Sequence, residues 1–156
     1  MLFVDWLIVA SVPTATAYQH KPWLFAFWGS ILALKLVGIV ALTVRQRFSK
    51  KVFFTYAANL KGSKVSYSDP DVERVRRAHL NDLENIPIWY IVTLLWLTTQ
   101  PSTWLAGILI KTFVIARFVH TLVYAVVPKQ PYRALAFFVG LGITIYQAIS
   151  TLTYYF

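Results

Sequence analysis

Long apolar stretches are the feature that most constrains how this chain can fold. Residues 23–44 form a stretch of 22 residues interrupted by a single charge, Lys35. An α-helix of that length, at about 1.5 Å per residue, covers the roughly 30 Å of bilayer hydrocarbon. Two further apolar stretches are residues 103–127, which contain Lys111, Arg117 and His120, and residues 134–156, which contain no charged residue. Charged residues make up only 13% of the chain, against about 25% in soluble domains. The sequence therefore predicts an integral membrane protein built from helices.

One more helix, the second in chain order, is predicted to begin at Asp69 and Pro70. There a capping residue precedes a proline suited to the first helical position. Its clearly apolar part, residues 86–97, would rise only about 18 Å and is shorter than a bilayer. The polar first half must extend the span or project beyond it. Pro87 would kink the helix or require another partner for the backbone carbonyl that it frees near Leu83. We expect an all-α integral membrane fold, with one four-transmembrane-helix up-down bundle over residues 1–156.

Basic residues gather on one side of the predicted bundle. Residues 45–68 form a basic loop without an acidic residue, and the turn at 128–133 adds Lys129 and Arg133. The positive-inside rule places these connections in the cytoplasm and both termini in a lumen. Residues 1–22 are interpreted as a lumenal extension or the first turns of the first helix. A cleaved signal peptide is the alternative, although Asp5 lies where such a peptide usually has a basic start.

The net charge of +9 would suggest nucleic-acid binding in a soluble protein. Here the basic residues flank apolar stretches, so membrane lipid and anionic small molecules are the expected partners, with no nucleic acid. The chain has no cysteine, which excludes a disulfide or a protein thiolate, and its three histidines lack metal-ligand spacing. We expect no metal site. Sulfur chemistry would need a thiol brought by the substrate.

Polar residues form stripes on two predicted helices, because steps of three and four positions keep side chains on one helical face. The stripes are Arg74, Arg77, Asn81 and Glu84 on the second helix, and Arg117, His120 and Tyr124 on the third. Arg47 and Arg133 lie at the same level on the other two helices. All four helices thus bring polar groups to one membrane leaflet.

Ionisable groups at bilayer depth are costly, and they usually pair, face a bundle interior or mark a substrate path. Arginines outnumber the acidic groups around Asp82 and Glu84, so the excess positive charge favours a bound anion with carboxylates, which guanidinium groups bind in bidentate fashion. Structural ion pairs, or side chains that reach the lipid headgroups, are the alternatives. Lys35 is either a pairing group in mid-membrane or a residue of a helix interface.

Three blocks of the sequence resemble the MAPEG family, the membrane-associated proteins in eicosanoid and glutathione metabolism. Residues 72–85 (VERVRRAHLNDLEN) are similar to the signature of its microsomal glutathione transferases. Residues 116–124 (ARFVHTLVY) resemble the third-helix motif of the family, and residues 131–140 (PYRALAFFVG) its fourth-helix entry. The resemblance covers about residues 24–150. It implies a homotrimer, with glutathione bound as co-substrate between subunits near the cytoplasmic face of the endoplasmic reticulum or outer mitochondrial membrane.

The resemblance also implies which residues form the site. Arg133 would stabilise the glutathione thiolate, with Tyr124 as a hydrogen-bond donor. The residues expected to bind glutathione are Arg47, Arg76, Arg77, His79, Asn81, Glu84, His120 and Tyr124, to which the polar stripe adds Arg117.

The implied activity is that of a glutathione transferase with peroxidase activity. Nearby positive charge favours a thiolate, which would attack hydrophobic electrophiles or lipid hydroperoxides arriving from the bilayer. A membrane protein that binds glutathione or an anionic lipid without turnover is one alternative, and an ion or proton pathway through the polar residues of the second helix is another. A third is a prostaglandin E synthase-like isomerase. Ala134 and Leu80 stand where that branch has serine and arginine, and both favour the transferase.

Overall fold

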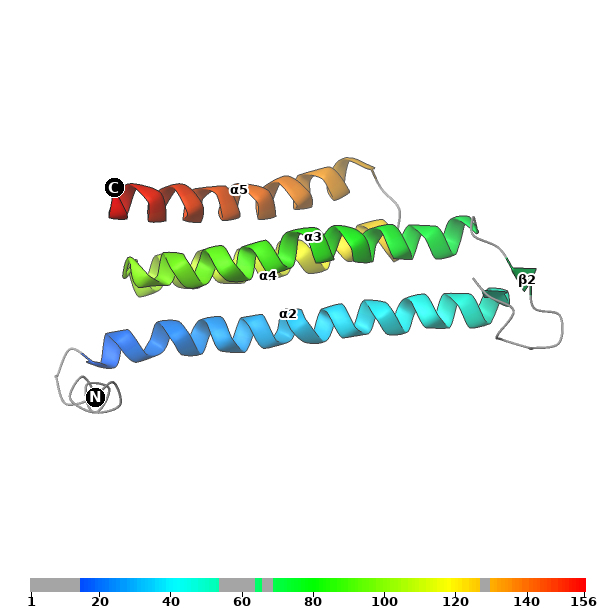
Figure 1. Ribbon diagram of the computed structural model, residues 1–156, viewed down its shortest axis with the longest axis horizontal. Helices are drawn as coiled ribbons and strands as arrows, with labels where there is room; N and C mark the ends of the chain where they lie inside the picture. Colours follow the sequence, from blue (N-terminus) through cyan, green and yellow to red (C-terminus); the bar gives the residue numbers. More distant parts are fainter. Residues whose placement is uncertain (1–14, 54–63, 66–68, 127–129) are drawn as a thin grey trace.

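The computed structural model describes residues 15–53, 64–65, 69–126 and 130–156. Four long helices run antiparallel in chain order, so the predicted all-helical up-down path is confirmed (Figure 1). The elements are α2 (Ala15–Lys50), β1 (Val52–Phe53), β2 (Lys64–Val65), α3 (Pro70–Thr98), α4 (Thr103–Thr121), the π-helix η1 (Leu122–Val126) and α5 (Gln130–Tyr155).

The two middle helices, α3 and α4, lie between α2 and α5, and each outer helix packs against both of them (Figure 1). The start of α2 and the end of α5 lie at one end of the bundle. The strands, the start of α3 and the start of α5 lie at the other end. This end carries the two basic connections of the sequence and is called the basic end below.

The first helix is longer than the sequence predicted. It begins at Ala15, so residues 15–22 belong to α2, with Pro22 inside the helix. It also continues to Lys50, so Arg45 and Arg47 are helical and not part of the predicted loop. Arginine, glutamine and lysine are good helix formers, and no breaker follows Val44. The small residues 15–17, which resemble a signal-peptide cleavage site, form the first turn of α2, and residues 1–14 lie outside the described residues.

The connection between α2 and α3 contains two short parallel strands, in which Val52 pairs with Lys64 and Phe53 with Val65. The sequence did not predict them.

The predicted start of α3 is confirmed. The Asp69 carboxylate accepts hydrogen bonds from the backbone N–H groups of Asp71 and Val72, both at 3.1 Å, and Pro70 is the first helical residue. Asp71 also forms a 2.6 Å ion pair with Lys50 at the end of α2. The hydrogen bond from Lys50 holds the pKa of the Asp71 carboxyl below its usual value. The ends of α2 and α3 are thereby joined at the basic end.

Three helical segments are long and apolar enough to cross a membrane: Lys21–Lys50, Thr103–Ala125 and Pro131–Tyr155. Helix α3 is not among them, because its first half is charged. It nevertheless continues through Pro87 as one helix of 29 residues, about 43 Å long. The polar half of this segment therefore lengthens the helix.

The core between α2, α3 and α4 is aromatic. The rings of Trp89 and Phe113 stack with centroids 4.3 Å apart and an angle of 2° between their planes. Leu32, Ile86 and Ile110 are fully buried around this pair. In lipid such a core is held by close packing rather than by exclusion of water, so this stack fixes how far the middle helices approach.

Candidate functional site

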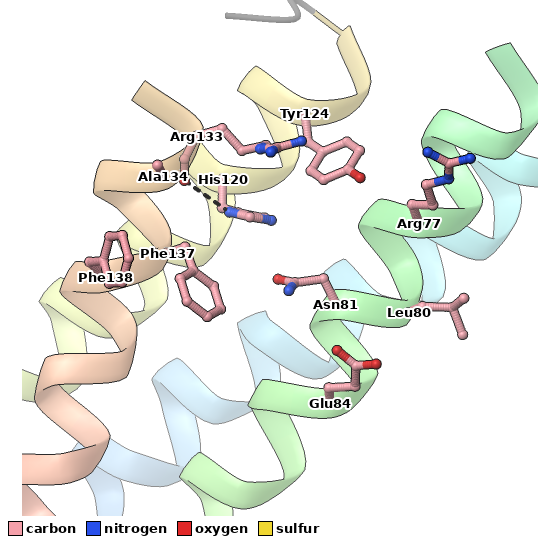
Figure 2. A pocket seen from close by; sticks show the side chains of 10 residues that line it. All are labelled: Arg77, Leu80, Asn81, Glu84, His120, Tyr124, Arg133, Ala134, Phe137 and Phe138. Atoms are coloured by element: carbon pink, nitrogen blue, oxygen red, sulfur yellow. Dashed lines mark hydrogen bonds between the residues drawn. The ribbon is translucent and has the colours of Figure 1, made fainter. Parts of the chain in front are cut away.

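A pocket of about 510 Å³ lies near the basic end, between α3 on one side and α4, η1 and α5 on the other (Figure 2). Its volume is within the range of roughly 300–1,000 Å³ usual for small-molecule sites. The lining residues are Arg77, Leu80, Asn81, Glu84, His120, Tyr124, Arg133, Ala134, Phe137 and Phe138. One wall is polar and the other combines polar and aromatic groups.

Helix α3 supplies the polar wall. Arg77, Asn81 and Glu84 follow each other by four and three positions and line the same pocket, whereas Arg74, the first residue of the predicted stripe, does not line it. Arg77 and Glu84 are exposed and Asn81 is half-buried. A cationic and an anionic group thus flank an amide along one face, an arrangement that suits a ligand bearing both charges.

Arg133 and Tyr124 form the opposite corner. The guanidinium carbon of Arg133 lies 4.7 Å from the centroid of the Tyr124 ring, in the geometry of a cation–π contact. Tyr124 belongs to the π-helix η1, which interrupts the α-helical hydrogen bonding just before α5. Such π segments frequently occur at functional sites. The contact holds a positive charge at the wall facing α3.

His120 is buried between α4 and α5, and its ring points into the pocket (Figure 2). Its Nδ1 donates to the backbone carbonyl of Arg133 at 3.3 Å, because a carbonyl can only accept. Its Nε2 has no hydrogen-bond partner among the described residues. In the neutral ring this Nε2 is an acceptor, and it is buried at the pocket wall without a donor from the part of the chain that the structure describes.

Behind the pocket lies a buried cluster around the Asp82 carboxylate, which is fully inaccessible. Lys35 of α2 forms an ion pair with it, Nε of Arg117 donates to it at 3.0 Å, and the Thr121 hydroxyl donates to it at 3.0 Å. The cluster joins α2, α3 and α4. Lys35, whose role the sequence left open, therefore pairs with Asp82 across the interface of α2 and α3.

Arg117 also contacts the pocket wall from behind. Its Nη2 donates to Oδ1 of Asn81 at 2.7 Å. A guanidinium has no acceptor, so the amide oxygen must face it and the Asn81 NH₂ group must face elsewhere. The Asn81 NH₂ group is thereby oriented to donate a hydrogen bond to a ligand.

The sequence profile of the MAPEG family matches residues 25–153, which includes every residue of the pocket. The chain belongs to the MAPEG family. Membership agrees with the resemblance found in the sequence.

Two kinds of relative are similar to this MAPEG protein. Microsomal glutathione S-transferase 1 of Rattus norvegicus is 38% identical over 130 residues, covering 80% of this chain and 84% of that protein. The Homo sapiens protein of the same name is equally similar, with the same coverage. Prostaglandin E synthase of Macaca fascicularis is 30% identical over 130 residues, covering 81% of this chain and 86% of that protein.

The structure brings six predicted site residues of this MAPEG protein together and leaves four outside. Those that line the pocket are Arg77, Asn81, Glu84, His120, Tyr124 and Arg133. Arg47, Arg76, His79 and Arg117 do not line it. Arg76 instead forms a bidentate contact with Glu73, with Nε and Nη2 at 2.9 and 3.0 Å from the carboxylate oxygens. Arg117 is 1% exposed and meets Asp82 and Asn81.

Sequence reasoning missed the apolar part of the pocket. Phe137 and Phe138 line it from α5, and Phe138 is exposed on its outer side. Phe137 follows Arg133 by four positions, so the helical repeat alone places both on one face. That spacing was the available signal.

Proposed function

We propose that this MAPEG protein is a microsomal glutathione transferase, which binds glutathione, stabilises its thiolate and conjugates it to hydrophobic electrophiles. The observation that carries the proposal is the pocket in which Arg77, Asn81 and Glu84 face His120, Tyr124 and Arg133. Relatives that are 38% identical carry the name of this activity.

Glutathione has two carboxylates, one ammonium group, two amides and a thiol, and the pocket of one chain offers partners for one carboxylate, the ammonium group, the amide groups and the thiol. Arg77 binds a carboxylate, and Glu84 binds the ammonium group. The NH₂ of Asn81 and Nε2 of His120 serve an amide oxygen and an amide N–H. The Arg133 guanidinium donates to the sulfur of glutathione, and the Tyr124 hydroxyl is the second donor.

The thiol is a weak nucleophile until it loses its proton, and adjacent positive charge favours the thiolate. In this proposal the Arg133 guanidinium, held over the Tyr124 ring, lowers the free energy of the sulfur anion. The thiolate attacks an electrophilic carbon and displaces its leaving group to give a conjugate. With a lipid hydroperoxide it attacks the terminal oxygen and breaks the O–O bond, which gives the alcohol and glutathione sulfenic acid, and a second glutathione converts the sulfenic acid to the disulfide and water. The exposed edge of Phe138 provides an apolar entrance from the bilayer.

The proposal includes a homotrimer, because one face of α3 is not covered by another described helix of the same chain. Leu83, Ile88, Ile91 and Leu95 are each roughly half-exposed, and Glu84 is exposed beside them. An ionised carboxylate facing lipid is costly, so a neighbouring subunit would cover this face.

Arg47, Arg76 and His79 would then complete the pocket of a neighbour. In this proposal the site lies near the cytoplasmic face of the endoplasmic reticulum or the outer mitochondrial membrane, because the positive-inside rule assigns the basic connections to the cytoplasm. Chemical cross-linking of the protein in its membrane tests the assembly, with a three-chain product as the expected result.

A prostaglandin E synthase-like isomerase is the second candidate, since relatives with that name are about 30% identical. Leu80 and Ala134 both line the pocket, at positions where that branch is expected to have arginine and serine. The pocket consequently lacks two polar groups expected for the isomerase. This difference favours conjugation.

The experiment uses the full chain in detergent. Addition of glutathione should produce the ultraviolet absorption band of a thiolate, and a chlorinated nitrobenzene should be conjugated. Glutathione binding without the band would support a binding protein without turnover, and absence of binding would refute both. Parallel assays with a lipid hydroperoxide and a prostaglandin endoperoxide test the peroxidase and isomerase activities.

A further inference from the structure

A second groove lies at the end of the bundle opposite to the pocket, between the first turns of α2 and of α4. Its volume is about 440 Å³. The lining residues are Trp23, Leu24, Thr103, Trp104, Gly107, Ile108 and Lys111. It shares no residue with the pocket near the basic end. The proposed reaction does not use this groove.

Lys111 is the charged residue of this groove. It is exposed, and it makes no ion pair with any part of the chain that the structure describes. It also lies inside the apolar segment Thr103–Ala125. A lone ammonium group at this depth is costly, so it must reach the interface or meet an anion.

The geometry of α4 directs Lys111 along the groove. The residue lies eight positions after Thr103, about 12 Å along the helix axis. Side chains on a helix point toward its N-terminus, which for α4 is the end where the groove opens. The long side chain of Lys111 therefore extends its ammonium group toward the headgroup level.

Two tryptophans mark that level. Trp23 is 63% exposed and Trp104 is 74% exposed, and tryptophans gather at membrane interfaces because the ring is apolar and its N–H is polar. Trp23 stacks on Phe27 with ring centroids 5.8 Å apart, which holds it at the groove edge. The groove thus has an interfacial rim with a cation below it.

Gly107 creates room between the rim and Lys111. A Cβ atom at this position would meet only Leu24, whose Cδ2 lies 3.6 Å away. Together with Ile108 and Leu24, the glycine leaves an apolar channel beside the cation. Its apolar lining suits a hydrocarbon chain.

We propose that this groove binds one anionic phospholipid, in the leaflet opposite to the glutathione pocket. The lipid phosphate meets the Lys111 ammonium group, the Thr103 hydroxyl and the tryptophan N–H groups donate to the headgroup, and an acyl chain lies over Gly107. Charge complementarity selects the lipid class. A zwitterionic headgroup brings its own cation and neutralises less of the charge on Lys111.

The test uses delipidated full-length protein in detergent, to which phosphatidylglycerol or phosphatidylcholine with identical acyl chains is added. At a lipid concentration about tenfold above the dissociation constant, the unfolding midpoint should rise by about 4 °C with phosphatidylglycerol. Phosphatidylcholine should give a smaller rise. Native mass spectrometry should show one retained phosphatidylglycerol per chain.

Two variants separate the charge from the channel. Lys111→Gln should abolish the preference for phosphatidylglycerol, and Gly107→Leu should reduce retention of both lipids by filling the channel. Lys51→Gln, an exposed lysine at the basic end, is the matched control and should retain the preference. Equal shifts with both lipids in the wild-type protein, or an unchanged preference in Lys111→Gln, would overturn the proposal. Conjugation activity in Lys111→Gln is measured separately and should match the wild type.

Discussion

Arg117 donates a 2.7 Å hydrogen bond from Nη2 to the side-chain oxygen of Asn81. This hydrogen bond determines which atom of the Asn81 side chain a ligand meets. The amide oxygen already accepts from Arg117, so the NH₂ group is the one that can donate to a ligand. The sequence predicted that Arg117 binds glutathione directly, whereas in the structure Arg117 orients the side chain of Asn81, which lines the pocket.

Replacing the amide tests this orientation. In Asn81→Asp, Arg117 keeps an oxygen to bind, but the group facing the ligand becomes an acceptor. We expect the KM for glutathione to rise about tenfold, the equivalent of one hydrogen bond of about 1.4 kcal/mol, with little change in the unfolding midpoint. Asn85→Asp, one turn along α3 and outside the pocket lining, is the control. A similar rise in both variants would contradict the assigned role.

Arg133 and Glu84 should affect different kinetic constants. Arg133→Ala should lower turnover about a hundredfold, the usual loss for one donor to a developing anion, and weaken the thiolate band while binding changes little. Glu84→Ala should raise the dissociation constant of glutathione about tenfold or more, because a charged partner is lost. Steady-state kinetics and calorimetry give both constants. Arg74→Ala is the control, since Arg74 pairs with Asp71 outside the pocket. Equal losses of affinity in the first two variants would refute the assignment.

The buried cluster around Asp82 should govern stability. Asp82→Asn leaves Lys35 and Arg117 without their shared carboxylate, and we expect a loss of about 3–5 kcal/mol in unfolding free energy. Adding Lys35→Met removes one uncompensated charge and should recover part of that loss. Thermal unfolding of the three proteins in one detergent measures the effect. A double variant no more stable than Asp82→Asn would show that charge balance is not the cause.

Gly29 should be required for the contact between α2 and α3. A Cβ atom there would lie 2.9 Å from Cε1 of Tyr90, whose hydroxyl donates to the Gly29 carbonyl at 2.5 Å. We expect Gly29→Ala to destabilise the protein by about 1–3 kcal/mol, as overpacking does. Gly38→Ala on the same helix meets nothing within 4 Å and should be neutral or stabilising, because alanine is the better helix former. An equal loss in both would indicate a general effect of glycine replacement.

Local features of the fold could be predicted, and features that depend on packing could not. The start of α3 follows from the capping geometry of Asp69 and Pro70, which involves neighbouring residues alone. The end of α2 was placed too early, since helix propensity carries it to Lys50 after the apolar stretch stops. The π-helix that carries Tyr124 was not predicted, since it packs against α3, a helix distant in the chain, and a local pattern does not reveal that contact.

By itself, the sequence determined that the chain forms apolar helices and that Arg77, Asn81 and Glu84 share one face. Both conclusions depend on side chains three or four positions apart and on the length of a helix relative to a bilayer. Only the tertiary structure decided that Lys35 meets Asp82 and that Arg117 supports Asn81. These partners are 47 and 36 positions apart, so their contact depends on which helices pack together and at what height, a relationship that no local pattern encodes.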